Sequence, residues 1–133
     1  MSKYRTIDVW NEFYGRKESA YDYAGRLMKK SACGDPNSAY HPTLDHIRPL
    51  SAGGCDVLGN IEICHRDTNE EKADSFPHWS ANERNFRAKR VKGTRTEYEI
   101  EEIYDQICER NRGGRLSCRP IDNRIMKFRG KMI

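Results

Sequence analysis

Residues 44–74 carry the pattern that most restricts how this chain can fold. Two short apolar runs, at 44–47 and 60–64, flank a loop with a glycine pair and predict a long-looped β-hairpin. Asp67 is followed three positions later by an acidic residue, which is the spacing of a helix cap, so a helix is predicted from there to about residue 74. A hairpin followed directly by a helix is therefore expected at the centre of the fold.

The flanking sequence predicts further helices, one strand and a basic tail. Thr6 is placed to cap a short helix, and Ser19 to begin a second one. Alternation over residues 85–91 predicts a strand, whereas Thr96 precedes isoleucines at helical spacing and predicts another helix. Residues 115–133 are basic and have little periodicity, so the tail is expected to be partly disordered.

The length and the distribution of charge indicate one compact domain in three parts. A chain of 133 residues is long enough for one small domain with a core but too short for two. We expect a helical lead-in at 1–40, the hairpin and helix at 41–75, and a basic extension at 76–133. Residues 1–32 contain seven basic and four acidic residues, for a net charge of +3. Residues 33–75 contain three basic and eight acidic residues, for −5, and residues 76–133 contain fourteen basic and eight acidic residues, for +6. An acidic centre between basic flanks is what a metal site among nucleic-acid-binding arms needs.

Composition excludes several classes of protein. No stretch approaches the roughly 20 apolar residues that span a bilayer, and the N-terminus has no apolar signal core, so a cytoplasmic location and no membrane partner are expected. Five cysteines, an odd number without a CxxC pair, argue against a disulfide framework and a four-cysteine zinc site. The remaining zinc hypothesis, from Cys33, Cys55, Cys64 and His65, has no regular spacing, so a structural zinc is not expected.

The central stretch holds the side chains that phosphodiester hydrolysis needs. Asp45 and His46 are adjacent in the first predicted strand, and Asn69 enters the predicted helix. A neutral histidine is a suitable base near neutral pH, since its unperturbed pKa is about 6.5. Carboxylate and amide oxygens are hard ligands that suit Mg²⁺ or Mn²⁺. Neighbouring strand residues point to opposite faces, so the strand must end or twist at this pair if both are to serve one site.

Eight positions in this order of elements form a composite signature: Asp45, His46, Pro49, Gly53, Gly54, Asn60, Asn69 and Lys72. The signature resembles that of the HNH endonucleases, and the chain is similar to small phage and bacterial HNH proteins. The resemblance implies an α+β fold with a ββα-metal core at 41–75, flanking helices and a basic C-terminal extension. Many HNH proteins also bracket this core with two CxxC pairs that bind zinc, which this chain lacks.

The resemblance also implies a role for each matched side chain. His46 would be the general base that takes a proton from the attacking water. Asp45 and Asn69 would hold a single Mg²⁺ or Mn²⁺, and Asn60 would tie the hairpin loop and orient His46. Lys72, one turn beyond Asn69, would contact a phosphate.

The expected partner is double-stranded DNA. Six positive charges fall within twelve residues without an acid between them: Arg84, Arg87, Lys89, Arg90, Lys92 and Arg95. Beside a phosphodiesterase motif, such a run is expected to follow a nucleic-acid backbone. Arg48 and Arg66 are further candidates for contact with the nucleic acid.

The predicted function is metal-dependent cleavage of DNA in a bacterial or phage-infected cell, as a nick or a double-strand break. By resemblance, the products would carry 5′-phosphate and 3′-hydroxyl ends. The alternative is a non-cleaving DNA-binding module on an HNH scaffold. The sequence leaves the oligomeric state, the DNA specificity and the biological role open.

Overall fold

The protein has an α+β fold, seen in a computed structural model that describes residues 2–103, 106–110, 112–114, 116–120 and 123–127. The described helices are α1 (Thr6–Tyr14) and α2 (Arg66–Lys72), with single 3₁₀ turns at Lys30–Ala32, Leu50–Ala52 and Leu58–Asn60. The described strands are β1 (Ser19–Tyr21), β2 (Leu27–Lys29), β3 (Pro42–His46), β4 (Ile61–His65), β5 (His78–Ala81), β6 (Arg84–Arg90), β7 (Tyr98–Ile103), β8 (Gln106–Arg110), β9 (Leu116–Pro120) and β10 (Asn123–Lys127). No helix among these residues is long and apolar enough to cross a membrane.

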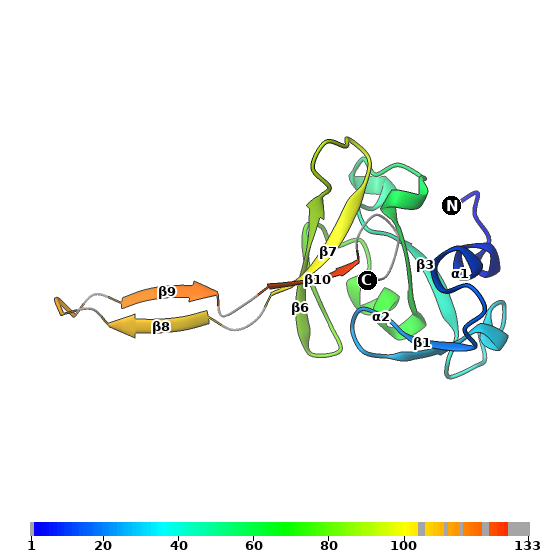
Figure 1. Ribbon diagram of the computed structural model, residues 1–133, viewed down its shortest axis with the longest axis horizontal. Coiled ribbons are helices and arrows are strands. Elements are labelled where there is room, and N and C mark those ends of the chain that lie inside the picture. The colour runs from blue at the N-terminus through cyan, green and yellow to red at the C-terminus, as the bar shows by residue number, and fades with distance from the viewer. Residues whose placement is uncertain (1, 104–105, 111, 115, 121–122, 128–133) are drawn as a thin grey trace.

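The described strands pair into small antiparallel sheets. Strands β10, β7, β6 and β5 lie side by side in that order, while β1–β2, β3–β4 and β8–β9 are separate hairpins. Figure 1 shows the four-stranded sheet on one side of the body and α1 on the other, with β3 and α2 between them. The β8–β9 hairpin extends away from the body.

Two apolar clusters cover the β3–β4 hairpin from opposite sides. One is made by Val9, Trp10, Met28, Ile61 and Ile63, and joins α1 to β4. The other joins the hairpin to the four-stranded sheet and is made by Tyr23, Ala24, Ile47, Cys64, Trp79, Ala81, Phe86, Tyr98 and Ile100. Because both faces are covered, every residue of β4 is buried. Burial of this kind fixes the strand register, since a slip by one residue would turn each side chain to the other face.

Helix α1 confirms the first predicted helix, but Thr6 does not cap it, because the N-cap residue is Arg5 and no side chain caps the helix there. It begins at Thr6 and ends before Gly15, which takes a φ of +61° and donates its N–H to Asn11 O at 3.0 Å. Glycine suits this position because a side chain would strain a left-handed backbone.

The predicted helix beginning at Ser19 is wrong, because residues 19–29 form the β1–β2 hairpin. At its turn, Asp22 Oδ1 accepts the N–H groups of Ala24 and Arg26 at 3.0 and 2.9 Å. Asp22 Oδ2 accepts the N–H of His65 at 2.9 Å, which ties the hairpin to the end of β4. Side-chain bonds of this type favour a turn over a helix.

The predicted helix beginning at Thr96 is also wrong, whereas the predicted strand at 85–91 is confirmed as β6. Strand β7 replaces the helix and pairs with β6 over six positions, from Asn85 opposite Ile103 to Arg90 opposite Tyr98. Strands β9 and β10 lie in the tail that was expected to be partly disordered, within its described residues.

Replacing Asp22 by Ala removes the acceptor of three backbone N–H groups and should destabilise the fold by about 3 kcal/mol. A single buried N–H without an acceptor costs about 1–3 kcal/mol. Urea unfolding of the variant and the wild type measures this loss. Asp8→Ala is the matched control, because its carboxylate only meets the exposed Arg5 at 2.8 Å. An exposed ion pair contributes about 0–1 kcal/mol. Equal losses in the two variants would contradict the anchoring role of Asp22.

Candidate active site

Asp45 and His46 lie at the end of β3 and line one pocket of about 230 Å³. The other lining residues are Leu44, Pro49, Leu50, Ser51 and Asp74. Strand alternation sends the two side chains to opposite faces of the hairpin, but β3 ends at His46. The structure thus confirms that the strand ends at this pair, and both residues line the pocket.

Asp45 faces α2, where it meets a buried lysine. Lys72 is 0% exposed, and its Nζ lies 3.0 Å from Asp45 Oδ2. The ammonium also donates to His46 O at 3.2 Å and lies 5.1 Å from the centre of the Trp79 ring. Burial raises the pKa of Asp45, and the ammonium opposes that rise.

The predicted phosphate contact of Lys72 therefore has a competing partner inside the protein. Its ammonium is enclosed by Asp45, His46 O and Trp79, so it faces no solvent in this structure. What the ammonium does here is hold the end of β3 against α2.

His46 faces the loop between β3 and β4, where it meets Asp56. His46 Nε2 lies 2.8 Å from Asp56 Oδ1, and the two side chains are 15% and 22% exposed. Asp56 also accepts Ser2 Oγ–H and the Lys3 backbone N–H, each at 2.7 Å. Burial raises the pKa of Asp56, but the hydrogen bonds from Lys3, His46 and Ser2 outweigh it and lower the pKa to about 2.

Sequence reasoning missed Asp56. The available signal was an acidic side chain in the loop of the predicted hairpin, two residues after the glycine pair. A loop of this length does not predict which of its side chains turns back to the strand, so that signal was too weak to use.

Asn60 ties this loop together from inside. Its side chain is fully buried, and its Oδ1 accepts the Arg48 N–H at 2.9 Å. Its Nδ2 donates to Arg48 O at 3.0 Å and to Cys55 O at 2.9 Å. The backbone adds a bond from Ile47 N–H to Asn60 O at 2.8 Å. The loop is thus fastened next to His46, at the place where Asn60 was expected to act.

The predicted nucleic-acid residue Arg48 also has partners within the protein. Its guanidinium donates to Ala52 O at 2.8 Å and to Tyr98 Oη at 2.9 Å. The loop closes so tightly around its backbone that a Cβ on Gly54 would lie 1.8 Å from Arg48 O. Glycine is required at that position for this reason.

Helix α2 begins at Arg66, one residue before the predicted start at Asp67, and His65 caps it in place of Asp67. His65 Nδ1 accepts the Asp67 N–H at 3.0 Å. The other ring nitrogen, Nε2, lies 2.6 Å from Ala39 O and therefore donates to it. His65 thus takes part in placing α2, a role that the sequence pattern did not predict.

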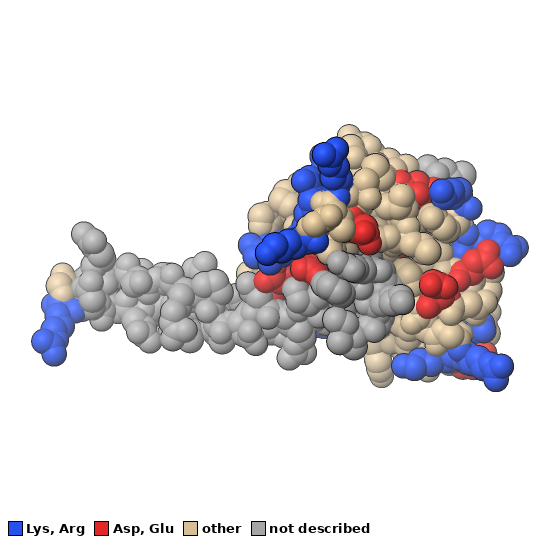
Figure 2. Space-filling model, turned by 45° about the horizontal axis from the view of Figure 1, so that its top comes forward, with Lys and Arg blue, Asp and Glu red and all other residues tan. Residues whose placement is uncertain are grey.

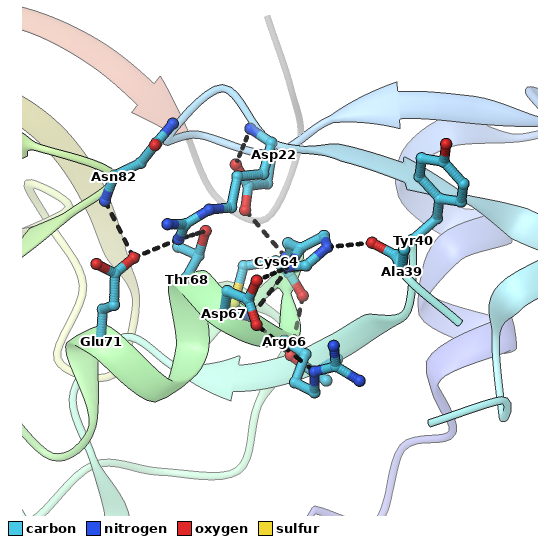
Figure 3. Close-up of polar contacts among 12 residues, drawn as sticks. Asp22, Ala39, Tyr40, Cys64, Arg66, Asp67, Thr68, Glu71 and Asn82 are labelled. Carbon is cyan, nitrogen blue, oxygen red and sulfur yellow. Dashed lines mark hydrogen bonds and ion pairs between the residues drawn. The ribbon is translucent and has the colours of Figure 1, made fainter. Parts of the chain in front are cut away.

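A polar network holds the first turns of α2 against two neighbouring hairpins, as Figure 3 shows for its labelled members. Arg26 bonds to Thr68 Oγ1 at 3.0 Å and to the Glu71 carboxylate. Glu71 also accepts the Asn82 N–H at 3.1 Å. The bonds from Arg26 and Asn82 lower the pKa of Glu71.

Asn69 projects from α2 toward β3. Its Nδ2 donates to Thr43 Oγ1 at 2.9 Å and to Leu44 O at 3.3 Å. Its Oδ1 receives no hydrogen bond from the residues that the structure describes. The amide oxygen is thus left available beside the strand that carries Asp45.

This donor set fits a hard divalent cation. Asp45 Oδ2 is buried and lies 3.0 Å from Lys72 Nζ, so a cation bound here would share this oxygen with the ammonium. A carboxylate oxygen and an amide oxygen are ligands that Mg²⁺ and Mn²⁺ accept. No group of three or more His, Cys, Asp or Glu among residues with described side chains is placed to hold a metal by itself. Any cation here would therefore need oxygens from water or substrate.

The basic residues of β6 face glutamates of β7. Arg84 bonds to Glu102 at 2.7 and 2.6 Å, and Arg87 bonds to Glu101 at 2.9 Å. The other candidates for nucleic-acid contact differ: Lys89 lies opposite Glu99, Arg90 meets Tyr98, Arg66 meets Pro36 O, and Lys92 is exposed. On the face in Figure 2, lysines and arginines form separate groups with acidic residues between them.

Comparison with known proteins found nothing similar: no family model matches the chain, and neither does any curated protein or solved structure. The geometry of the site and the sequence pattern are thus the basis for a functional proposal.

Replacing Asn60 by Ala should lower the free energy of unfolding by about 2–4 kcal/mol, because it strands a backbone N–H and two carbonyls in the loop. Chemical denaturation measures the change. Asn11→Ala, on the exposed face of α1, should stay within about 0.5 kcal/mol of wild type. A loss below about 1 kcal/mol in Asn60→Ala would show that the loop does not depend on this amide.

The stability that Asp56 supplies should depend on pH in one direction. Its pKa of about 2 lies below the ordinary 3.8, so ionised Asp56 stabilises the fold above pH 3.8. Asp56→Asn should thus cost about 1–2 kcal/mol near neutral pH, and the difference from wild type should shrink as pH falls toward 2. Denaturation curves of the variant and the wild type, recorded from neutral pH down to about pH 2, test this prediction. A stability difference between the two proteins that grows as the pH falls would contradict it.

Proposed function

We propose that this chain is a metal-dependent endonuclease of the HNH type, which hydrolyses phosphodiester bonds of double-stranded DNA by nicking or double-strand cleavage. One observation carries the proposal: Asp45 and His46 line the same pocket, at the end of a strand against which Asn69 docks from α2. The order β3, β4, α2 supports a ββα-metal core as the fold of this unit.

His46 has the chemistry of the general base. It reaches the pocket, and Asp56 engages only one of its ring nitrogens. A base within reach of a water molecule contributes about 10²–10⁴-fold to a hydrolysis rate. Proton transfer to His46 therefore supplies part of the rate enhancement and leaves a larger part to charge stabilisation and positioning.

Asp45 and Asn69 are the residues that would hold Mg²⁺ or Mn²⁺. A bound cation would supply charge stabilisation at the phosphate and at the leaving oxygen. Lys72 keeps the Asp45 carboxylate in place through their contact at 3.0 Å. The bonds of Asn69 to Thr43 and Leu44 turn its amide so that the oxygen is the free atom.

The same ion pair favours a second candidate function, a non-cleaving DNA-binding module. The Lys72 ammonium already neutralises Asp45, so a cation must compete with it or bind alongside it. Titration with Mn²⁺ distinguishes the two functions. The nuclease requires binding that is lost in Asp45→Ala, whereas the binding module requires none.

Exposed basic residues support DNA as the partner. Lys92 and Arg95 are exposed, in the segment between β6 and β7. Contacts of this kind with phosphates position a duplex but do not read its sequence. We therefore propose that they contribute affinity and not specificity.

Incubation of supercoiled plasmid with Mg²⁺, Mn²⁺ or EDTA tests the proposed activity. The wild type should convert plasmid to nicked or linear product with metal and not with EDTA. His46→Ala should be slower by about 10²–10⁴-fold. His78→Ala, which removes an exposed histidine on β5, is the matched control and should keep the wild-type rate.

Two results would contradict this assignment. Cleavage at the wild-type rate by His46→Ala would show that His46 is not the base. Salt-sensitive DNA binding by the wild type and His46→Ala, without cleavage by either, would favour the binding module.

A further inference from the structure

The contact between His46 and Asp56 determines which ring nitrogen of His46 carries a proton. Hydrogen bonds from Lys3, His46 and Ser2 lower the pKa of Asp56 to about 2, so its carboxylate is ionised near neutral pH and can only accept hydrogen bonds. At 2.8 Å from Asp56 Oδ1, His46 Nε2 must therefore carry the hydrogen. The neutral ring then has its lone pair on Nδ1.

Nδ1 is left available for chemistry. It accepts no hydrogen bond from any residue in the described part of the chain, whereas Nε2 is engaged by Asp56. His46 lines the pocket together with Asp45, so a water molecule bound there can approach the ring from the pocket. The geometry is that of a base whose second nitrogen is held by a carboxylate.

Asp56 is itself held by the N-terminal segment. Ser2 Oγ–H donates to the oxygen that faces His46, and the Lys3 N–H donates to the other oxygen, each at 2.7 Å. These donors lie more than 50 positions away in the sequence, so the segment before α1 packs onto the loop after β3. Both carboxylate oxygens are thus occupied, which fixes the orientation of the group.

We propose that Asp56 is a positioning residue of the active site: it fixes His46 in the Nε2–H tautomer, so that Nδ1 takes the proton of the attacking water. Residues 2 and 3 hold Asp56 in the orientation that this requires. The proton transfer rests on the function proposed above, whereas the tautomer does not.

The reaction balances with this assignment. The water oxygen forms a bond to phosphorus while its proton moves to His46 Nδ1, and the bond from phosphorus to the 3′ oxygen breaks. The leaving oxygen takes a proton from solvent, and Nδ1 later returns its proton to solvent. Asp56 accepts from Nε2–H throughout and remains ionised, next to the imidazolium that forms.

A purely structural role for Asp56 makes a different prediction. If Asp56 only fastens the N-terminal segment, its replacement lowers stability but leaves the ring of His46 unchanged. Long-range ¹H–¹⁵N NMR of the histidine ring separates the two roles, because a protonated ring nitrogen and one with a lone pair have different ¹⁵N shifts. The measurement needs no substrate and is made at about pH 8, where an ordinary imidazole is neutral.

Asp56→Asn is the main variant because it keeps the shape of the side chain. Its amide oxygen should turn to the Lys3 N–H and its NH₂ group to His46, which reverses the tautomer to Nδ1–H. Asp56→Ala should give a mixture of both tautomers. Asp35→Asn is the matched control, since it makes the same substitution at an exposed carboxylate that bonds to the Asn37 N–H and not to His46, and it should leave the tautomer of His46 as in the wild type.

Kinetics of plasmid cleavage give the second readout. Asp56→Asn should lower kcat by at least about tenfold. Its loss of kcat should not exceed that of His46→Ala, which is about 10²–10⁴-fold because a general base contributes that much to the rate. KM for DNA should change by less than about twofold, because Asp56 acts through His46 and does not touch the substrate. Adding Asp56→Asn to the His46→Ala variant should not lower kcat further, because Asp56 acts through His46.

The outcomes separate this proposal from the function on which part of it rests. An Nδ1–H tautomer in the wild type, or an unchanged tautomer in both Asp56 variants, overturns the positioning role. The expected tautomers with a wild-type kcat in Asp56→Asn overturn it as well. The expected tautomers in a protein that cleaves no DNA overturn the nuclease function and the proton transfer, and leave the control of the tautomer established.

Discussion

The buried amide of Asn60 is the interaction on which the geometry of the site depends. It bonds both backbone groups of Arg48 and the carbonyl of Cys55, so a single side chain joins the start and the middle of the loop between β3 and β4. The amide of asparagine offers one acceptor and two donors on a short side chain, whereas aspartate can only accept and leucine can do neither. The loop carries Asp56, so the fastening by Asn60 also sets where His46 finds its partner.

Adjacent positions on β3 reach oppositely charged partners because the strand sends them to different faces. Asp45 meets the ammonium of Lys72 on one side, and His46 meets the carboxylate of Asp56 on the other. Both side chains are thus oriented by partners within the protein. Asp74 adds a further carboxylate to the pocket, so a phosphate diester could enter this acidic surrounding only with positive charge to accompany it. For the proposed nuclease, a divalent cation would supply that positive charge.

The sequence predicted the parts of the fold in which local patterns and tertiary packing agree. Strands β3 and β4, helix α2 and strand β6 have the expected type, because apolar runs and turn residues there match the buried faces. Residues 19–29 were misread, since their apolar spacing fits a helix but the bonds of Asp22 select a turn. Strand β7 was misread because isoleucines at helical spacing also fit a strand that is buried on both faces, where Glu101 and Glu102 meet basic partners of β6.

The candidate site was predictable in its residue types but not in its pairings. The sequence shows that Asp45 and His46 are adjacent and how many residues separate them from Asn69. The partners Lys72 and Asp56 depend on which way side chains leave a strand end and on how a long loop folds back. Local propensity contains neither fact, because both are set by contacts between distant segments.

The arginines of β6 that face glutamates of β7 determine how strongly salt would weaken the proposed binding of DNA. Each protein cation that neutralises a phosphate releases condensed counterions from the duplex, and the number released sets the slope of affinity against salt concentration. Arg84 and Arg87 are already neutralised across the sheet, so a phosphate would have to displace Glu102 and Glu101 before any counterion is released. The salt dependence of DNA affinity would therefore reflect unpaired side chains such as Lys92. Its slope would be smaller than expected if every basic residue of the strand neutralised a phosphate.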